Sequence, residues 1–150
     1  MSFDWTTVDN KTPLFSLEDT YCQCKVVNVY DGDTCKVVFP FSGKMYRWNV
    51  RLTGYDTPEM RPPRSQANRD EEIKAAYAAR DFLRGKVMNE NQLVYIKCGE
   101  FDKYGRLLGT IYPHYENENQ VGGGFSFNQI LINEEFAHEY HGGTKKSFNI

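Results

Sequence analysis

Hydrophobic and polar residues alternate most regularly over residues 45–52. The even positions of this segment are hydrophobic, whereas the odd positions carry Met45, Arg47, Asn49 and Arg51. A period of two residues is typical of a β-strand with one buried face, so Arg51 is predicted on the face opposite the core. Shorter patterns rich in Val, Tyr, Ile and Phe predict the other strands over residues 21–30, 33–39, 92–98 and 106–112.

Two further segments have the composition or the spacing of helices. Residues 68–87 are rich in Ala, Glu, Lys and Arg, which favour helix, and apolar residues recur there at helical spacing. A shorter helix is predicted to begin after Ser126, because Gln129 completes a capping-box pattern, and to run to about Glu134. The buried stripe of the longer helix is predicted to be Ala75, Ala79, Phe82 and Leu83.

Five short strands with helices between and after them predict a small closed barrel. We therefore expect a β-rich α+β fold, a five-stranded OB-fold barrel with two to three helices, a fold whose surface often serves nucleic acids. Residues 1–20 show no clear period and are expected to form an irregular N-terminal arm. Residues 21–150 are expected to form one domain, because a chain of 150 residues can bury a core without a disulfide.

The chain carries 18 basic and 20 acidic residues, which gives a formal net charge of −2. Nucleic-acid binders usually carry a strongly basic patch and a high isoelectric point, so tight nonspecific binding to DNA is not expected from the total charge. A nuclease is still compatible with it, because one bound divalent cation would offset this charge. Residues 1–20 lack the basic start and apolar run of a secretory signal, and no stretch approaches a membrane span. A cytoplasmic or other intracellular location without membrane contact is expected.

The four cysteines are predicted to be free thiols. Cys22 and Cys24 lie two apart in a predicted strand and face the same side, which places them poorly for a mutual disulfide. The remaining pair, Cys35 and Cys98, adds no Cys-x-x-Cys spacing of the kind that zinc uses. A chain without disulfides suits a reducing compartment.

Candidate chemistry is concentrated between Asp31 and Glu59. Two predicted strands joined by a turn at Ser42-Gly43 bring four carboxylates and Arg51 to the ends of neighbouring strands. Carboxylate oxygens are the ligands that Ca²⁺ prefers, and a planar guanidinium can meet two phosphate oxygens at once. A metal, a phosphate contact and a spare glutamate together indicate phosphodiester hydrolysis. Each half alone also has a structural interpretation, because Asp-Gly favours a turn and Thr-Pro-Glu can start a helix.

Three motifs together resemble the staphylococcal nuclease (thermonuclease) family. They occur in the order that is typical of the family, and the spacings from Arg51 to Asp56 and from Asp56 to Glu59, five and three residues, agree with it. The resemblance covers about residues 20 to 145 and implies the same OB fold. The motifs are Asp31-Gly32-Asp33-Thr34, Arg51 followed by Asp56-Thr57-Pro58-Glu59, and Asp102-Lys103-Tyr104-Gly105-Arg106.

The resemblance implies a calcium site with a catalytic glutamate beside it. Asp33 and Asp56 would bind Ca²⁺ directly, together with the backbone carbonyl of Thr57. Asp31 would lie close by and hold water of the ion rather than the ion itself. Glu59 would orient or deprotonate the attacking water, a role that typically supplies about 10²–10⁴ in rate.

The resemblance also implies contacts to the substrate. Arg51 and Arg106 correspond to the two phosphate-contacting arginines of the family, which would neutralise the charge that grows on the phosphorus. For Lys103 and Tyr104, contact with a substrate phosphate and simple exposure at a turn are both open. Tyr140 lies where the family has base-stacking tyrosines and is the candidate for that contact. Structural roles are expected for Tyr55, His114, His138 and His141.

The expected function is a Ca²⁺-dependent endonuclease that acts on DNA and RNA with little sequence specificity. Family chemistry implies 3′-phosphate products and a preference for single-stranded substrates, and a monomer is expected. The alternative is a catalytically silent OB-fold module that binds nucleic acid or protein, which the acidic net charge slightly favours.

Overall fold

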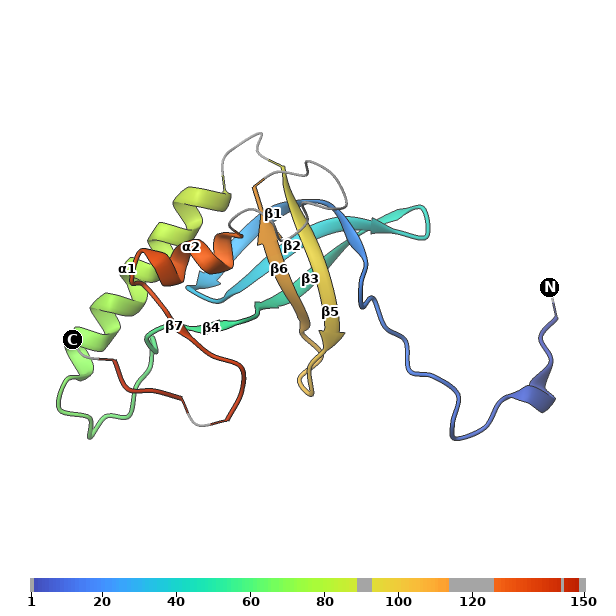
Figure 1. Ribbon diagram of the computed structural model, residues 1–150, viewed down its shortest axis with the longest axis horizontal. Coiled ribbons are helices and arrows are strands. Elements are labelled where there is room, and N and C mark those ends of the chain that lie inside the picture. The colour runs from blue at the N-terminus through green and yellow to red at the C-terminus, as the bar shows by residue number, and fades with distance from the viewer. Residues whose placement is uncertain (1, 89–92, 114–125, 144, 149–150) are drawn as a thin grey trace.

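Five strands close into a barrel in the computed structural model, which describes residues 2–88, 93–113, 126–143 and 145–148 (Figure 1). Around the barrel the strands follow the order β1-β2-β3-β6-β5. All pairs are antiparallel except β3 with β6, so the sheet is mixed. The predicted β-rich α+β fold with a five-stranded OB-type barrel is thus confirmed. The strands are β1 (Tyr21–Asp31), β2 (Thr34–Phe41), β3 (Lys44–Leu52), β5 (Val94–Phe101) and β6 (Leu107–Tyr112).

The hairpin of β2 and β3 fixes the register near the predicted site. Its turn at Ser42-Gly43 has left-handed φ values of 51° and 82°, which suit a two-residue hairpin. The turn aligns the strands so that Thr34 pairs with Arg51 at their far ends. Val50 and Leu52 are fully buried inside the barrel. Because side chains alternate along a strand, Arg51 lies on the outer face, as the sequence pattern predicts.

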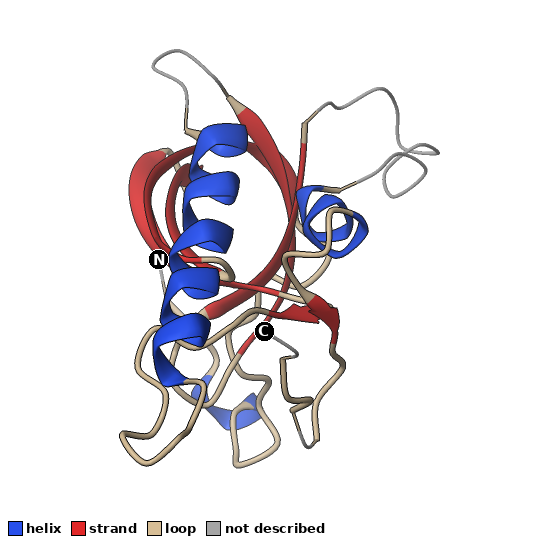
Figure 2. Ribbon diagram, turned by 90° about the vertical axis from the view of Figure 1, so that its left-hand side faces the viewer, coloured by secondary structure: helices blue, strands red, loops and turns tan. Residues whose placement is uncertain are grey.

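Helix α1 (Arg69–Val87) lies across one side of the barrel and packs against β1 (Figure 2). The predicted stripe is right for Ala79 and Leu83, which are buried, but wrong for Ala75, which is only half-buried. Ala76 takes the buried position, because a shift of one residue turns a helix by about 100°. Phe82 is half-buried and packs against the core, as the predicted stripe requires.

Helix α2 (Phe127–Asn133) begins at the predicted cap. The Ser126 hydroxyl oxygen accepts a hydrogen bond from the Gln129 backbone N–H at 2.9 Å. The Gln129 side chain donates to Asn133 Oδ1, so it does not return to the cap as a full capping box would require. The prediction is therefore right for the start of the helix and wrong for the second half of the box.

A two-stranded sheet that the sequence pattern did not predict joins β4 (Tyr55–Asp56) to β7 (His138–Glu139). Asp56 pairs with His138, and Tyr55 pairs with Glu139. Strands of two residues are too short to show a period. This small sheet brings the segment after α2 alongside the residues that follow β3.

The barrel interior holds three of the four cysteines, and Cys22 is half-buried beside them. All four are free thiols. Burial raises the pKa of Cys35 and of Cys98 to about 12, which keeps these thiols protonated and poorly reactive. None of the helices in the described residues is long and apolar enough to cross a membrane.

The residues before β1 are irregular apart from one 3₁₀ turn, η1 (Trp5–Thr7), which Asp4 caps. The segment runs away from the barrel (Figure 1). Its last part is anchored, because Leu17 is buried in the core and Phe15 packs edge-on against Phe41 with ring centroids 5.4 Å apart.

Candidate functional site

The turn between β1 and β2 is packed too tightly for a side chain at its centre. A β-carbon at Gly32 would lie 2.7 Å from Thr57 Cγ2 and 3.0 Å from Ala79 Cβ of helix α1. Tyr55 also stabilises the turn, since its buried hydroxyl donates to the Gly32 carbonyl oxygen at 2.7 Å. The turn, and the two aspartates that flank Gly32, are therefore held in a fixed place against α1 and the loop after β4.

The two aspartates of this turn face different partners. Asp31 Oδ1 accepts a hydrogen bond from the Asp33 backbone N–H at 3.1 Å. Burial and the neighbouring Asp33 carboxylate raise the pKa of Asp31 to about 7. Asp33 reaches toward the loop after β4, where Thr57 Oγ1 donates to Asp33 Oδ2 at 3.2 Å. Asp31 thus braces the turn, while Asp33 faces the rest of the site.

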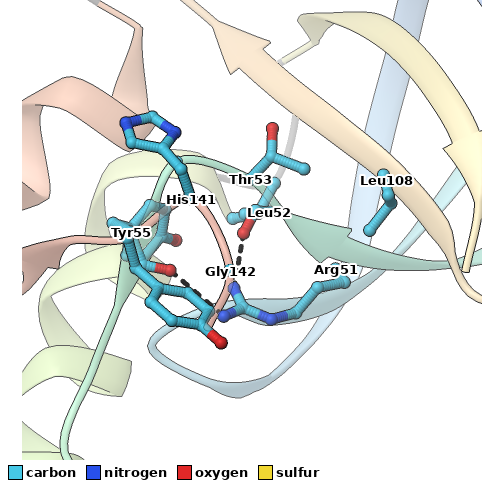
Figure 3. A pocket seen from close by; sticks show the side chains of 9 residues that line it. Arg51, Leu52, Thr53, Tyr55, Leu108, His141 and Gly142 are labelled. Carbon is cyan, nitrogen blue, oxygen red and sulfur yellow. Dashed lines mark hydrogen bonds between the residues drawn. The ribbon is translucent and has the colours of Figure 1, made fainter. Parts of the chain in front are cut away.

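Arg51 lies between two carboxylates that come from different motifs. Its Nη2 is 3.3 Å from Asp33 Oδ2 and 3.8 Å from Asp56 Oδ1. Figure 3 shows the guanidinium donating to the backbone carbonyl oxygens of Leu52 and Tyr55 as well. The fold therefore gathers Asp33, Arg51 and Asp56 into one cluster and fixes the arginine from four sides.

Asp56 contributes a buried oxygen to this cluster that accepts no hydrogen bond among the described residues. This oxygen, Oδ1, has only ion pairs, with Arg51 and with Lys145. Burial raises the pKa of Asp56, and the charge of Lys145 opposes that rise. A hard divalent cation would satisfy this oxygen, so Asp33, Asp56 and the adjacent Thr57 carbonyl suit the predicted ligand set.

A site of this kind would rest on two carboxylates. Within the described parts of the chain, no group of three or more Asp, Glu, His or Cys side chains is placed to hold one metal ion. Backbone carbonyl and water oxygens would have to complete the coordination of Ca²⁺, which commonly uses both.

Glu59 lies at the exposed edge of the cluster on a loop that α1 holds. Its backbone N–H donates to Glu72 Oε2 at 2.8 Å. Gln66 Nε2 donates to the other oxygen of the same carboxylate, also at 2.8 Å. Glu72 is buried on the helix, so it fixes the loop backbone while the Glu59 side chain stays 56% exposed. No local sequence pattern predicts this role of Glu72.

Lys145 also joins the site without having been predicted there. Its Nζ is 3.3 Å from Asp56 Oδ1 and 3.2 Å from Glu59 Oε1. Partial burial acts to lower the pKa of Lys145, but the carboxylates of Asp56 and Glu59 raise it overall, so the amine is charged. Because Glu59 and Lys145 are 86 positions apart in the chain, no local pattern could have indicated the contact.

The turn between β5 and β6 forms a second cluster around Asp102. Asp102 Oδ1 accepts from the backbone N–H groups of Tyr104 and Arg106, and Oδ2 accepts from Arg106 Nε at 2.8 Å. Gly105 closes the turn with a φ of +81°, which glycine adopts without steric cost. Although its burial acts in the opposite direction, these hydrogen bonds lower the pKa of Asp102. Asp102 therefore positions Arg106.

The same turn presents two cations around one exposed ring. Lys103 Nζ and Arg106 Cζ lie 5.2 and 5.4 Å from the centroid of the Tyr104 ring, and Tyr104 is 72% exposed. Strand β6, which begins at Leu107, runs parallel to β3, and Arg51 pairs with Leu108. The two predicted arginines thus come from β3 and from the turn that leads directly into the neighbouring strand β6.

A pocket of about 390 Å³ opens beside Arg51. Leu52 and Leu108 line it from the barrel, and His141 from the segment after β7 (Figure 3). Tyr140 of the same segment lines it as well. Tyr140 is held there by hydrogen bonds from its backbone N–H to the Gly54 carbonyl and from its hydroxyl to the Gly143 carbonyl. The structure therefore brings Tyr140 to the pocket next to Arg51.

A family described as staphylococcal nuclease homologue matches residues 49–149, more than half of the chain. The chain belongs to this family. A comparison with curated proteins finds no match. The staphylococcal nuclease homologue match includes Arg51, Asp56, Glu59 and Arg106 but begins after the turn that carries Asp33. In the structure, Asp33 nevertheless contacts the matched region, because it forms an ion pair with Arg51.

The side chains of His138 and His141 have partners outside the cluster of Asp33, Arg51 and Asp56. The His138 ring stacks on Phe148 with centroids 4.2 Å apart, and His141 Nε2 is 3.0 Å from Glu139 Oε1. His114 falls outside the described residues.

Proposed function

We propose that this staphylococcal nuclease homologue is a Ca²⁺-dependent endonuclease that hydrolyses DNA and RNA with little sequence specificity. The observation that carries the proposal is the position of Arg51, held 3.3 Å from Asp33 and 3.8 Å from Asp56. A pair of carboxylates suited to a hard cation and an arginine suited to phosphate share one cluster. Members of the family typically depend on Ca²⁺.

In this proposal, Asp33, Asp56 and the Thr57 carbonyl would hold Ca²⁺, and Asp31 would hold water beside it. When bound, the ion would act as a Lewis acid on the phosphate and stabilise the negative charge of the transition state. The buried Oδ1 of Asp56, which has ion pairs but no hydrogen bond among the described residues, supports this assignment.

The protein side chains supply the proton transfer and the remaining charge stabilisation. Glu59 accepts a proton from the water that attacks phosphorus in line with the 5′-oxygen. The bond from phosphorus to that oxygen breaks, the oxygen takes up a proton from solvent, and the other product keeps a 3′-phosphate. Arg51 and Arg106 donate hydrogen bonds to the phosphate oxygens as their charge grows.

The pocket beside Arg51 supports a preference for unpaired bases. Its apolar walls and Tyr140 offer a stacking surface, which is worth about 1–3 kcal/mol per base in single-strand binders. A base can enter such a pocket only after it leaves the duplex stack. Lys103 and Tyr104 would contact a neighbouring phosphate of the same strand.

A catalytically silent binding module is the second candidate. The observation that favours it is Lys145, whose amine pairs with both Asp56 and Glu59. An acidic chain with a net charge of −2 also gives a nuclease no general attraction to nucleic acid.

Cleavage of a fluorescent single-stranded DNA separates the two candidates. We expect wild-type protein to cut it in millimolar Ca²⁺, but not in chelator, and Glu59→Gln to lose about 10²–10⁴ in rate. Calorimetry should show that the variant still binds Ca²⁺, because Glu59 is no ligand in the proposed site. Wild-type protein that leaves the DNA intact while binding it would establish the silent module.

A further inference from the structure

The outer face of β1, β2 and β3 is a continuous surface that starts at Arg51. Strand register aligns outward-facing residues in rows across the three strands. The row at the site contains Arg51, and each further row lies two residues along β2 and β3, which is about 6.6 Å. On β1 the step is three residues, because the register shifts there. From the site outward, the rows are Asp31-Thr34-Arg51, Asn28-Lys36-Asn49 and Lys25-Val38-Arg47. We call the second and third rows the basic strand face.

Charge is distributed very unevenly between this sheet and the rest of the chain. From residue 20 to residue 55 the acidic residues are Asp31 and Asp33, both at the candidate site. The whole chain carries 20 acidic and 18 basic residues, so the acidic excess lies elsewhere. The basic residues of this segment are Lys25, Lys36, Lys44, Arg47 and Arg51.

The three cations of the basic strand face have no ion-pair partner in the part of the chain that the structure describes. Lys25 and Arg47 are exposed and Lys36 is half-buried. None of them forms an ion pair with another described residue, in contrast to Arg51 and Arg106. Their positive charge is therefore available to an external anion.

The same face offers groups that suit bases. The amides of Asn28 and Asn49 flank Lys36 and are exposed. Beyond them lies an open hollow of about 600 Å³, lined by Val38, Met45 and other apolar side chains. Proteins that bind single-stranded nucleic acids combine a positively charged groove with side chains against which bases stack, most often aromatic ones, and this face places cations beside an apolar hollow.

We propose that the basic strand face binds the continuation of a single-stranded polynucleotide whose scissile phosphate lies at Arg51. The inference rests on the proposed function for its class of ligand and adds the path that the strand follows. Arg47 is four residues from Arg51, about 13 Å along β3, so only a substrate of several nucleotides engages the whole face. An acidic protein thereby concentrates its attraction for phosphates on one sheet that leads to the site.

The test is binding of a fluorescein-labelled 20-nucleotide single-stranded DNA, measured by anisotropy in chelator at several salt concentrations. The variant is Lys25→Gln/Lys36→Gln/Arg47→Gln. Its matched control, Lys11→Gln/Lys74→Gln/Lys86→Gln, changes the net charge equally but on the N-terminal segment and on α1. Each phosphate contact contributes about 0.7 to the slope of log K against log salt.

We expect the face variant to lose at least about tenfold in affinity and about 2 in that slope, and the control to stay within about twofold of wild type. Circular dichroism should show both variants folded, since all six side chains are exposed or half-buried. In Ca²⁺, cleavage of the 20-nucleotide DNA should slow in the face variant, whereas cleavage of a dinucleotide should not change.

Equal affinity of the face variant and wild type, or equal losses in both variants, would overturn the inference. Because binding is measured without Ca²⁺, this result is separate from the proposed function. A wild type that binds through the face but cuts nothing keeps the inference and removes the nuclease. The face could instead hold the acidic N-terminal segment of a second copy. Sedimentation would then show a dimer that the face variant disrupts, while the affinity for DNA stays unchanged. That result would make the inference wrong.

Discussion

The candidate site has two halves that differ in exposure. The barrel half contains Asp33, Arg51 and Asp56, and the loop half contains Glu59 and Lys145. Side chains around the barrel ends are buried, with exposed fractions of 6% for Asp56 and 14% for Arg51. Side chains on loops and on the last described segment are open, with 56% for Glu59 and 49% for Lys145. In the barrel half Arg51 has four partners, whereas each of the two loop side chains has one or two.

In the proposed function, this difference separates the residues that bind the ligands, which are buried, from those that take part in the reaction, which are exposed. Groups that hold charge in place are arranged before any ligand arrives, which reduces the ordering that binding must supply. The groups proposed to touch water and the leaving nucleotide stay accessible. A change in the barrel half should therefore affect both stability and activity, and a change in the loop half should affect activity alone.

The largest contrast is expected between two arginine substitutions, Arg51→Met and Arg106→Met. Each should lower the rate of cleavage about 10²–10³-fold, because each removes a hydrogen-bond donor to the charged phosphate. Arg51→Met should also lower the free energy of unfolding by about 3 kcal/mol, since it leaves Asp33 and Asp56 close together without their cation. Arg106→Met removes a half-exposed pair with Asp102 and should cost at most about 1 kcal/mol.

Urea unfolding in chelator and in Ca²⁺ provides the measurement. Ca²⁺ should restore part of the stability of Arg51→Met, because a cation between the two carboxylates replaces the lost charge. The comparison of the two halves is wrong if the two variants unfold at the same urea concentration in chelator.

A smaller effect is expected from Gly32→Ala, which alters the barrel half without changing a charge. The new β-carbon would lie 2.7 Å from Thr57 Cγ2 and 3.0 Å from Ala79 Cβ, and overpacking of this kind costs about 1–3 kcal/mol. Gly85→Ala on α1 is the matched control, because its β-carbon would meet nothing within 4 Å. Alanine favours helix over glycine by about 1 kcal/mol, so thermal unfolding should show the control stabilised. Two variants with the same melting temperature would contradict the tight packing at Gly32.

The barrel half could be predicted from the sequence because its physics is local. A period of two along β3 and the Ser42-Gly43 turn determine the face on which Arg51 lies, and the hairpin then pairs it with Thr34. The capped start at Ser126 is equally local, since the bond to Gln129 spans three residues. Patterns of this kind need no knowledge of distant packing.

The contacts that could not be predicted join segments that are far apart in the chain. Lys145 reaches Glu59 across 86 positions, and the two-residue strands β4 and β7 are too short to show a period. The prediction placed Ala75 instead of Ala76 on the buried face of α1, because residue type alone does not distinguish two neighbouring alanines. Only packing against the barrel decides between them.

The smallest effect is expected from Lys145→Gln, which probes where the two halves meet. Its amine pairs with Asp56 of the barrel half and with Glu59 of the loop half, at 3.3 and 3.2 Å. A cation at Asp56 must compete with this amine, so its removal should tighten Ca²⁺ binding. The Lys145 side chain is 49% exposed, so solvent screens its pairs, and screened pairs are worth about 0.2–1 kcal/mol. This corresponds to at most about fivefold in the dissociation constant from calorimetry. Lys146→Gln is the control, since it removes the same charge from an exposed neighbour. Equal Ca²⁺ affinities in the two variants would mean that Lys145 acts only through general charge, whereas a gain confined to Lys145→Gln would show that the lysine and the metal share Asp56.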